Sequence, residues 1–92
     1  MKATGLLTQS RWYVTEVTTK RTLANPKATI KDLELENKAN EILNEVKPNE
    51  LGDVTLLAAV VEDVITETKY FDRVVRRVRI HCVVAVDYGE EQ

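Results

Sequence analysis

The segment of residues 74–88 constrains the fold more than any other part of the sequence, because its side chains alternate in character. Its even positions are mostly β-branched apolar residues. Its odd positions are basic at Arg77 and Arg79 and become apolar around Val83. Alternation with a period of two residues is typical of a long β-strand that buries one face. We therefore expect a strand whose second face is basic toward one end and apolar toward the other.

The length of 92 residues fits a single small domain over residues 1–92, with the small and polar residues 1–9 flexible. Its one cysteine, Cys82, excludes an intrachain disulfide and is typical of a reducing compartment. The N-terminus does not resemble a signal peptide, and the longest apolar run, residues 56–61, is far shorter than the ~20 residues of a membrane-spanning helix. We therefore expect a soluble, cytoplasmic protein that does not bind membranes.

The first half of the chain predicts one strand and one helix. Residues 11–19 are rich in β-branched and aromatic side chains, which favours a strand. Apolar residues recur every three or four positions over residues 36–46, which indicates an amphipathic helix with Asn37 as its N-cap and Pro48 at its end. Residues 28–35 fit either a short second strand or the beginning of that helix.

Residues 51–70 fit two structures. Their apolar positions would form one face of a helix, but eight of these residues are β-branched, which favours a strand. We expect a strand that forms a hairpin with residues 74–88 around a loop of Phe71 and Asp72, although the usual glycine is missing. The fold class is then α+β, with an antiparallel sheet of three or four strands, a long C-terminal hairpin and one amphipathic helix packed on one face.

The register of this hairpin follows from charge and hydrophobicity. With the two-residue loop, Glu67 faces Arg76 and Glu62 faces His81, which are favourable cross-strand pairs. The apolar pairs on one side of the hairpin are Ile65–Val78, Val61–Cys82, Ala59–Val84 and Leu57–Val86. An acidic side chain would fall on this apolar side, so we expect a β-bulge near residues 62–63.

The second side of the hairpin is also apolar at the end far from the loop. One helix covers only one side of a sheet, and a monomer rarely exposes a large apolar patch. We therefore expect a second copy of the chain, or a target protein, to cover this side. The alternative is that the N-terminal segment with Leu6, Leu7 and Trp12 folds over it. The predicted contact consists of Leu56, Ala58, Val60, Val83 and Ala85, with Arg77 and Arg79 at its rim.

No arrangement of residues in the sequence is typical of an enzyme. His81 and Cys82 are adjacent, so on a strand they point to opposite faces and do not form a catalytic pair. The adjacent acids at 62–63 and at 90–91 do not converge on one point, and the three glycines are isolated, so they form no phosphate-binding loop. With one histidine and one cysteine, we expect neither a metal site nor a cofactor.

Two basic segments indicate an alternative function. Residues 20–31 and 69–79 contain nine of the thirteen basic residues and one acid. Cations next to aromatic side chains at a hairpin loop suit phosphates and unpaired bases. A nucleic-acid-binding module of this kind would use Lys20, Arg21, Lys27, Tyr70, Phe71, Arg73, Arg77 and Arg79. Whether the two segments meet in space does not follow from the sequence.

The order of a strand, a helix and a long hairpin resembles that of the dodecins, small flavin-binding proteins that assemble into shells. In dodecins a flavin-stacking tryptophan lies early in the second strand, where this chain has Val54, Thr55, Leu56 and Leu57. We therefore do not expect this chain to bind flavin. A small-ligand carrier with a site between subunits is nevertheless a third, weaker hypothesis.

The sequence thus predicts a non-enzymatic interaction or assembly module that self-associates or binds a target protein through one face of its sheet. Its small size is also compatible with an accessory protein of a phage or mobile element.

Overall fold

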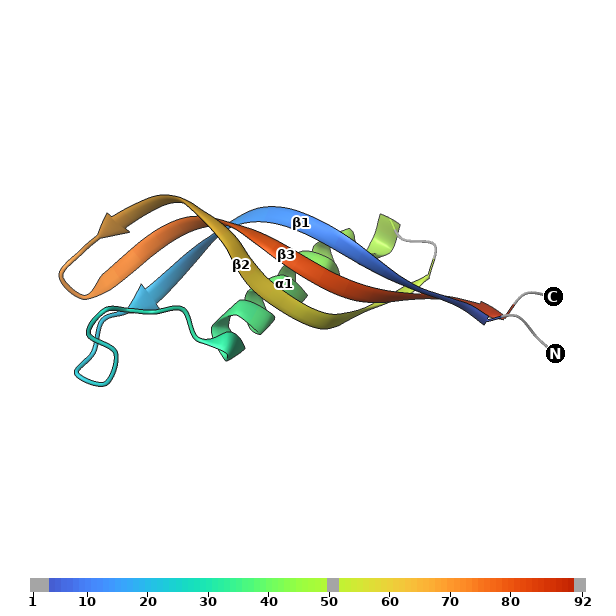
Figure 1. The fold of residues 1–92 in the computed structure, drawn as a ribbon, viewed down its shortest axis with the longest axis horizontal. Coiled ribbons are helices and arrows are strands. Elements are labelled where there is room, and N and C mark those ends of the chain that lie inside the picture. The colour runs from blue at the N-terminus through green and yellow to red at the C-terminus, as the bar shows by residue number, and fades with distance from the viewer. Residues whose placement is uncertain (1–3, 50–51, 91–92) are drawn as a thin grey trace.

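The computed structural model describes residues 4–49 and 52–90, which form a three-stranded antiparallel sheet and one long helix (Figure 1). In chain order the elements are β1 (Thr4–Lys20), α1 (Asp32–Val46), the short 3₁₀ helix η1 (Lys47–Asn49), β2 (Asp53–Lys69) and β3 (Arg73–Glu90). The strand order β1-β3-β2 places β3 in the centre. The predicted α+β fold with one helix on an antiparallel sheet is confirmed.

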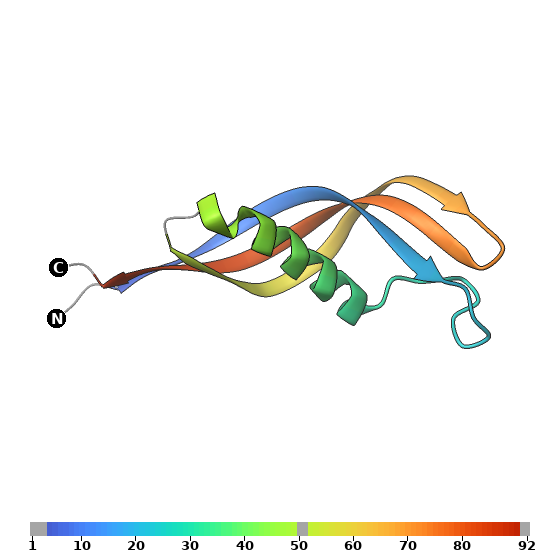
Figure 2. The ribbon, with the colours of Figure 1, turned by 180° about the vertical axis from the view of Figure 1, so that it is seen from behind.

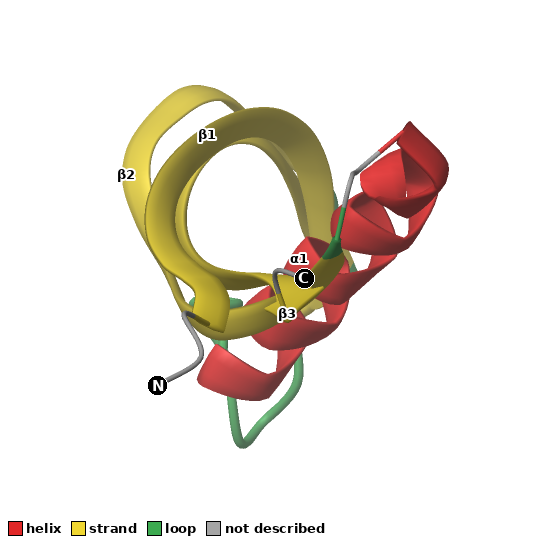
Figure 3. Cartoon of the chain, turned by 90° about the vertical axis from the view of Figure 1, so that its right-hand side faces the viewer, coloured by secondary structure: helices red, strands yellow, loops and turns green. Residues whose placement is uncertain are grey.

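The molecule is elongated, with extents of 58 × 22 × 19 Å, because each strand has 17 or 18 residues. The turn between β2 and β3 lies at one end, and the beginning of β1 and the end of β3 lie at the other (Figure 1). Figure 2 shows α1 running across one face of the sheet. Seen along the long axis, the strands wind around it as a coiled ribbon (Figure 3), in keeping with the twist that long strands acquire.

The core lies between α1 and the even-numbered side chains of β3. Five fully buried apolar side chains of β3 belong to this core: Val78, Ile80, Cys82, Val84 and Val86. Val74, nearer the loop, is also fully buried but lies outside this core. Leu35, Ala39 and Leu43 of α1 belong to the same core cluster. Their spacing of four residues places them on one side of the helix. The predicted alternation of β3, with one face buried, is therefore confirmed.

The helix begins earlier than the sequence indicates. It starts at Asp32, after Lys31, whose side chain makes no capping hydrogen bond. Asp32 and Glu34 lie in the first turn, where carboxylates interact favourably with the positive end of the helix dipole. Of the two interpretations of residues 28–35, the short strand is wrong, and Asn37 lies inside the helix instead of capping it. The C-terminal end of α1 at Val46 is the predicted one, and η1, which contains Pro48, follows it directly.

The first strand also begins earlier than predicted. It starts at Thr4 and pairs with β3 as far as Glu90, so residues 4–9, which we expect to be flexible, are part of the sheet. Residues 1–3 lie outside the described part of the chain. The alternative in which Leu6, Leu7 and Trp12 fold over the second face is wrong, because these residues belong to a strand in the plane of the sheet.

The prediction of a strand at residues 51–70 is confirmed over β2, and so is the hairpin loop; residue 51 lies outside the described residues. The N–H of Tyr70 donates to the carbonyl of Arg73, with an N···O distance of 2.8 Å, so Phe71 and Asp72 form a two-residue loop. Glu67 lies opposite Arg76, as their opposite charges predict. The register next to the loop is therefore the predicted one.

Farther from the loop, β2 contains three bulges, at Ile65, Glu62 and Leu57, where the pairing with β3 skips a residue. The bulge at Glu62 is the predicted one, and the other two are additional. Each bulge shifts the pairing by one residue, so the four predicted apolar pairs and the pair Glu62–His81 are wrong. The observed partners of Val78, Ile80, Cys82, Val84 and Val86 are Val64, Val61, Ala59, Leu56 and Val54.

Arg76 occupies an even, buried position of β3 among apolar neighbours. Its Nε donates to Oε2 of Glu67 at 2.9 Å, and its Nη1 and Nη2 donate to the backbone carbonyls of Ala28 and Lys27. Ala28 is fully buried and has a positive φ of 51°, a conformation that costs ~1–2 kcal/mol for a residue with a Cβ atom. Arg76 thus holds the connection between β1 and α1 against the sheet.

We expect Arg76→Met to lower the free energy of unfolding by ~1–3 kcal/mol, because it leaves the buried carbonyl of Ala28 without its donor. Urea denaturation followed by circular dichroism measures this loss. The matched control is Arg79→Met on the exposed face of the same strand, where we expect a change within about 0.5 kcal/mol. Equal losses in both variants would contradict the role assigned to Arg76.

Candidate functional site

We call the face of the sheet opposite to α1 the open face. It consists of the odd-numbered side chains of β3 and their partners in β1 and β2. In β3 these are Val75, Arg77, Arg79, His81, Val83 and Ala85; their partners in β1 are Thr18, Glu16, Val14, Trp12, Ser10 and Thr8, and in β2 Thr68, Thr66, Asp63, Val60, Ala58 and Thr55. Since α1 lies on the other face, no described element covers this one.

A stacked aromatic pair lies in the middle of the open face. The rings of Trp12 and His81 are 4.8 Å apart between centroids and inclined by only 7°, and Val60 lies on the other side of His81. The Nε2 atom of His81 is buried and has no hydrogen-bond partner among the described residues. Trp12 and Val60 remain 55% and 54% exposed. A partner that covers this centre would bury a large apolar surface.

Most of the predicted contact residues lie on the open face. Ala58, Val60, Val83 and Ala85 line its apolar part, and Arg77 and Arg79 follow toward the hairpin loop. Leu56 does not belong to this set: it lies opposite Val84, is half-buried, and packs against the core under α1. Its predicted position on the open face is wrong because the bulge at Leu57 reverses the alternation of β2 at that point.

The prediction missed Trp12 and Val14, which are the largest apolar contribution of β1 to the open face. Their parity in the sequence shows that they share one side of their strand. The side of the sheet that they occupy depends on the pairing of β1 with β3, which joins residues far apart in the sequence.

The open face carries charges of both signs toward the loop. Glu16 lies opposite Arg77, and Asp63 lies opposite Arg79. The cations lie on the central strand and the carboxylates on the outer strands. Arg77 and Arg79 form no ion pair shorter than 4.0 Å with a described carboxylate, so both guanidinium groups remain open to a partner.

The two basic segments meet at the loop end of the molecule, which we call the tip (residues 20–27 and 69–73). Lys20 lies opposite Arg73, and the N–H of Arg21 donates to the carbonyl of Asp72 at 2.8 Å. The guanidinium group of Arg21 also donates to the carbonyls of Tyr70 and Pro26, at 3.1 and 3.3 Å. Arg21 therefore joins the β2–β3 loop to the segment after β1.

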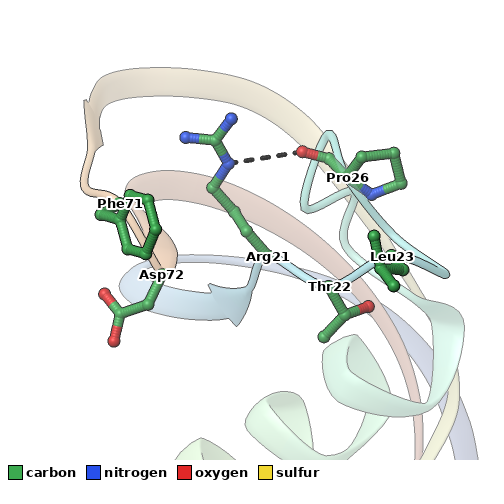
Figure 4. A pocket seen from close by; sticks show the side chains of 6 residues that line it. All are labelled: Arg21, Thr22, Leu23, Pro26, Phe71 and Asp72. Atoms are coloured by element: carbon green, nitrogen blue, oxygen red, sulfur yellow. Dashed lines mark hydrogen bonds between the residues drawn. The ribbon is translucent and has the colours of Figure 1, made fainter.

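The tip exposes apolar side chains among its cations. Phe71 and Leu23 are fully exposed, and the Arg73 guanidinium lies 4.3 Å from the centre of the Tyr70 ring. A shallow hollow lies between the two loops (Figure 4). Its lining consists of Arg21, Thr22, Leu23, Pro26, Phe71 and Asp72.

The residues of the nucleic-acid hypothesis are partly brought together. Six of them form the tip: Lys20, Arg21, Lys27, Tyr70, Phe71 and Arg73. Arg77 and Arg79 lie farther along β3, on the open face, with the same parity as Arg73. Among the described residues, Arg73 pairs with Asp72 at 2.9 Å, whereas Lys20, Arg21 and Lys27 have no carboxylate within 4.0 Å.

Cys82 is fully buried between the helix and the sheet, as its even position predicts. Burial raises the pKa of its thiol, so the reactive thiolate is disfavoured. Within residues 4–49 and 52–90, no three or more His, Cys, Asp and Glu side chains lie close enough together to hold a metal ion. None of the helices in the same ranges has the length and hydropathy to cross a membrane.

A comparison of this chain with known protein families, curated proteins and solved structures found no significant match.

The pair of Glu67 and Arg76 makes stability depend on pH. The hydrogen bond from Arg76 lowers the pKa of Glu67, and Lys69 at 3.7 Å acts in the same direction. A carboxylate whose pKa is lower in the folded state stabilises the fold at neutral pH, and this contribution is lost as the pH falls through the folded pKa. We therefore expect Glu67→Gln to be less stable than the parent at pH 7 and equally stable once Glu67 is protonated. Urea denaturation at a series of pH values measures the difference, and a constant difference would contradict it.

Proposed function

We propose that the protein is a non-enzymatic assembly module that binds a second copy of itself through the open face. The observation that carries the proposal is an uncovered apolar surface around Trp12, Val14 and Val60, which are each about half exposed. It continues into half-buried Val83 and Ala85 on the central strand. Stable protein contacts bury about 800 Å² per partner, roughly one eighth of the 6718 Å² surface of this chain.

Burial of apolar surface favours such a contact. Burying a large apolar side chain contributes ~1.5–3 kcal/mol. Trp12 and Val14 on β1 and Val60 on β2 flank the central strand at the level of His81 and Arg79. The stacked pair of Trp12 and His81 adds aromatic surface in the centre. Aromatic side chains with few rotatable bonds are enriched at the energetically important positions of interfaces.

The charges on the same face support a second copy as the partner. Arg77 and Arg79 lie on the central strand, whereas Glu16 and Asp63 lie on the outer strands. Two such faces in opposite orientations can place the arginines of each chain near the carboxylates of the other. In such an orientation the surface would be complementary to itself, which would give the contact specificity.

We expect Val60→Glu and Val83→Glu each to lower the average mass in solution, because a carboxylate in the apolar contact would lose its hydration without gaining a partner. Size-exclusion chromatography with light scattering measures the mass, and circular dichroism checks that the fold is retained. Asn40→Glu on the exposed side of α1 is the control that adds the same charge elsewhere. An unchanged mass for both open-face variants would refute the proposed contact.

Nucleic-acid binding by the tip is the second candidate, favoured by the meeting of the two basic segments. Phosphates would contact the cations at the tip and along β3, and Phe71 and Tyr70 offer aromatic faces to unpaired bases. The cations of this candidate site are Lys20, Arg21, Lys27, Arg73, Arg77 and Arg79. Because the whole chain has a net charge of −2, this binding would depend on these clustered cations and not on the overall charge.

For this second candidate we expect the affinity for a labelled single-stranded oligonucleotide to fall steeply with salt. Replacing Lys20, Arg73 and Arg77 with glutamine should reduce the slope of log K against log salt by about 0.7 for each phosphate contact removed. The control with the same loss of charge replaces Lys31, Lys38 and Lys47, which lie at α1 and η1. Fluorescence anisotropy measures both, and no binding at low salt would exclude this function.

A further inference from the structure

The two outer strands differ in the regularity of their free edges. Strand β2 is interrupted by bulges at Leu57, Glu62 and Ile65. Strand β1 pairs with β3 in one unbroken register from Leu6 to Lys20, and contains neither proline nor glycine in that range. Proteins use bulges, proline and short strands to prevent an edge from pairing with another chain. Between Leu6 and Lys20, the edge of β1 has none of these features.

The register shows which backbone groups of β1 point outward. The N–H of Arg21 donates to the carbonyl of Asp72, which continues the pairing of β1 with β3. Hydrogen-bonded and non-hydrogen-bonded pairs alternate along an antiparallel ladder. The odd-numbered residues of β1 therefore bond to β3, and the even-numbered residues direct their N–H and C=O groups away from the sheet. These are Thr8, Ser10, Trp12, Val14, Glu16 and Thr18.

We propose that β1 pairs antiparallel with β1 of a second copy, around a twofold axis at Tyr13 and perpendicular to the sheet. This axis keeps the open faces of both copies on the same side and joins two three-stranded sheets into one of six strands. Trp12 of each chain then lies opposite Val14 of the other, in a pair that exchanges two backbone hydrogen bonds. Both side chains are about half exposed in the single chain, and each covers the other across the axis.

The other residues of β1 are compatible with this register. Glu16 lies opposite Ser10 of the second copy, and Thr8 lies opposite Thr18, so no like charges face each other. Of the three strands, α1 lies closest to β2. It approaches β1 near the C-terminal end of that strand, where the Thr19 hydroxyl donates to Glu34. This hydrogen bond and the hollow that α1 shares with β1 lie at residues 16–19 of the strand, not at the edge around Tyr13. The edge contact does not use Val60 or Val83, although Trp12 and Val14 border both contacts. It rests on the proposed self-association and deepens it by adding a second contact made through backbone hydrogen bonds. Two isologous contacts on one chain build an assembly larger than a dimer.

Cysteine cross-linking tests the register directly. In the proposed pairing, the two copies of residue 13 form a non-hydrogen-bonded pair with Cα atoms ~4.5 Å apart, which a disulfide can bridge. We expect Tyr13→Cys to form a covalent dimer under mild oxidation, and Thr15→Cys, four residues out of register with its own copy, to form little. The parent chain controls for Cys82, which is buried. Cross-linking at neither position, or more at 15 than at 13, would overturn the proposal.

A proline variant separates the edge contact from the open-face contact. Ser10→Pro removes one outward N–H without breaking the ladder to β3, because proline is tolerated at the free edge of a sheet. Ser10 is exposed and is not one of the apolar side chains of the open-face contact. We expect Ser10→Pro to lower the average mass, while Ser10→Ala, which keeps the N–H, retains more of the assembly. Trp12 is the sole tryptophan, so its emission should also shift to longer wavelength in Ser10→Pro. If Val83→Glu lowers the mass and Ser10→Pro does not, the edge contact is wrong and the open-face contact stands; the reverse result rejects the open-face contact alone.

Discussion

The pairing of β3 along both of its edges is the constraint on which the rest of the structure depends. Because β1 and β2 occupy the two edges of β3 along nearly its whole length, its side chains decide which face of the sheet is covered. The even face is apolar apart from Arg76, so α1 packs there and closes the core. The odd face carries Arg77, Arg79 and His81 and stays open. The stability of the fold and the candidate contact surface thus belong to opposite sides of one strand.

Much of the fold can be predicted from sequence because the strongest signals are local. The alternation of β3 and the apolar spacing of α1 each lie within one segment. Glu67 and Arg76 pair within one hairpin, close to its two-residue loop. The bulges at Leu57 and Ile65 cannot be predicted in this way, because a bulge changes the register and leaves the composition of the strand unchanged. Leu56 shows the consequence, since the bulge beside it places it on the covered face.

The candidate site is less predictable than the fold because it combines segments far apart in the chain. Hairpin pairing alone is enough to place Val60 and Val83 on one face. Adding Trp12 and Val14 requires the position of β1 beside β3, and a long-range strand order does not follow from local pattern. The tip has the same origin: the basic segments meet because β1 ends beside the β2–β3 loop, where Arg21 bonds to Asp72. The sequence of a regular strand shows which of its residues share a side, whereas the pairing between strands shows which sides lie on the same face of the sheet.

The open face and the tip suit partners of different kinds, and one can make the other effective. An apolar contact depends little on salt, whereas attraction between a few cations and a polyanion weakens as salt is added. Among the described residues, a single tip has few cations without a carboxylate partner, among them Lys20, Arg21 and Lys27, so its proposed contact with one strand of nucleic acid would be weak. The proposed assembly through the face or the edge of the sheet would leave the tip of each copy exposed, and several linked tips would meet one polyanion at a high effective concentration. If both proposals hold, self-association is the physical condition under which so small a basic surface becomes a useful binding site.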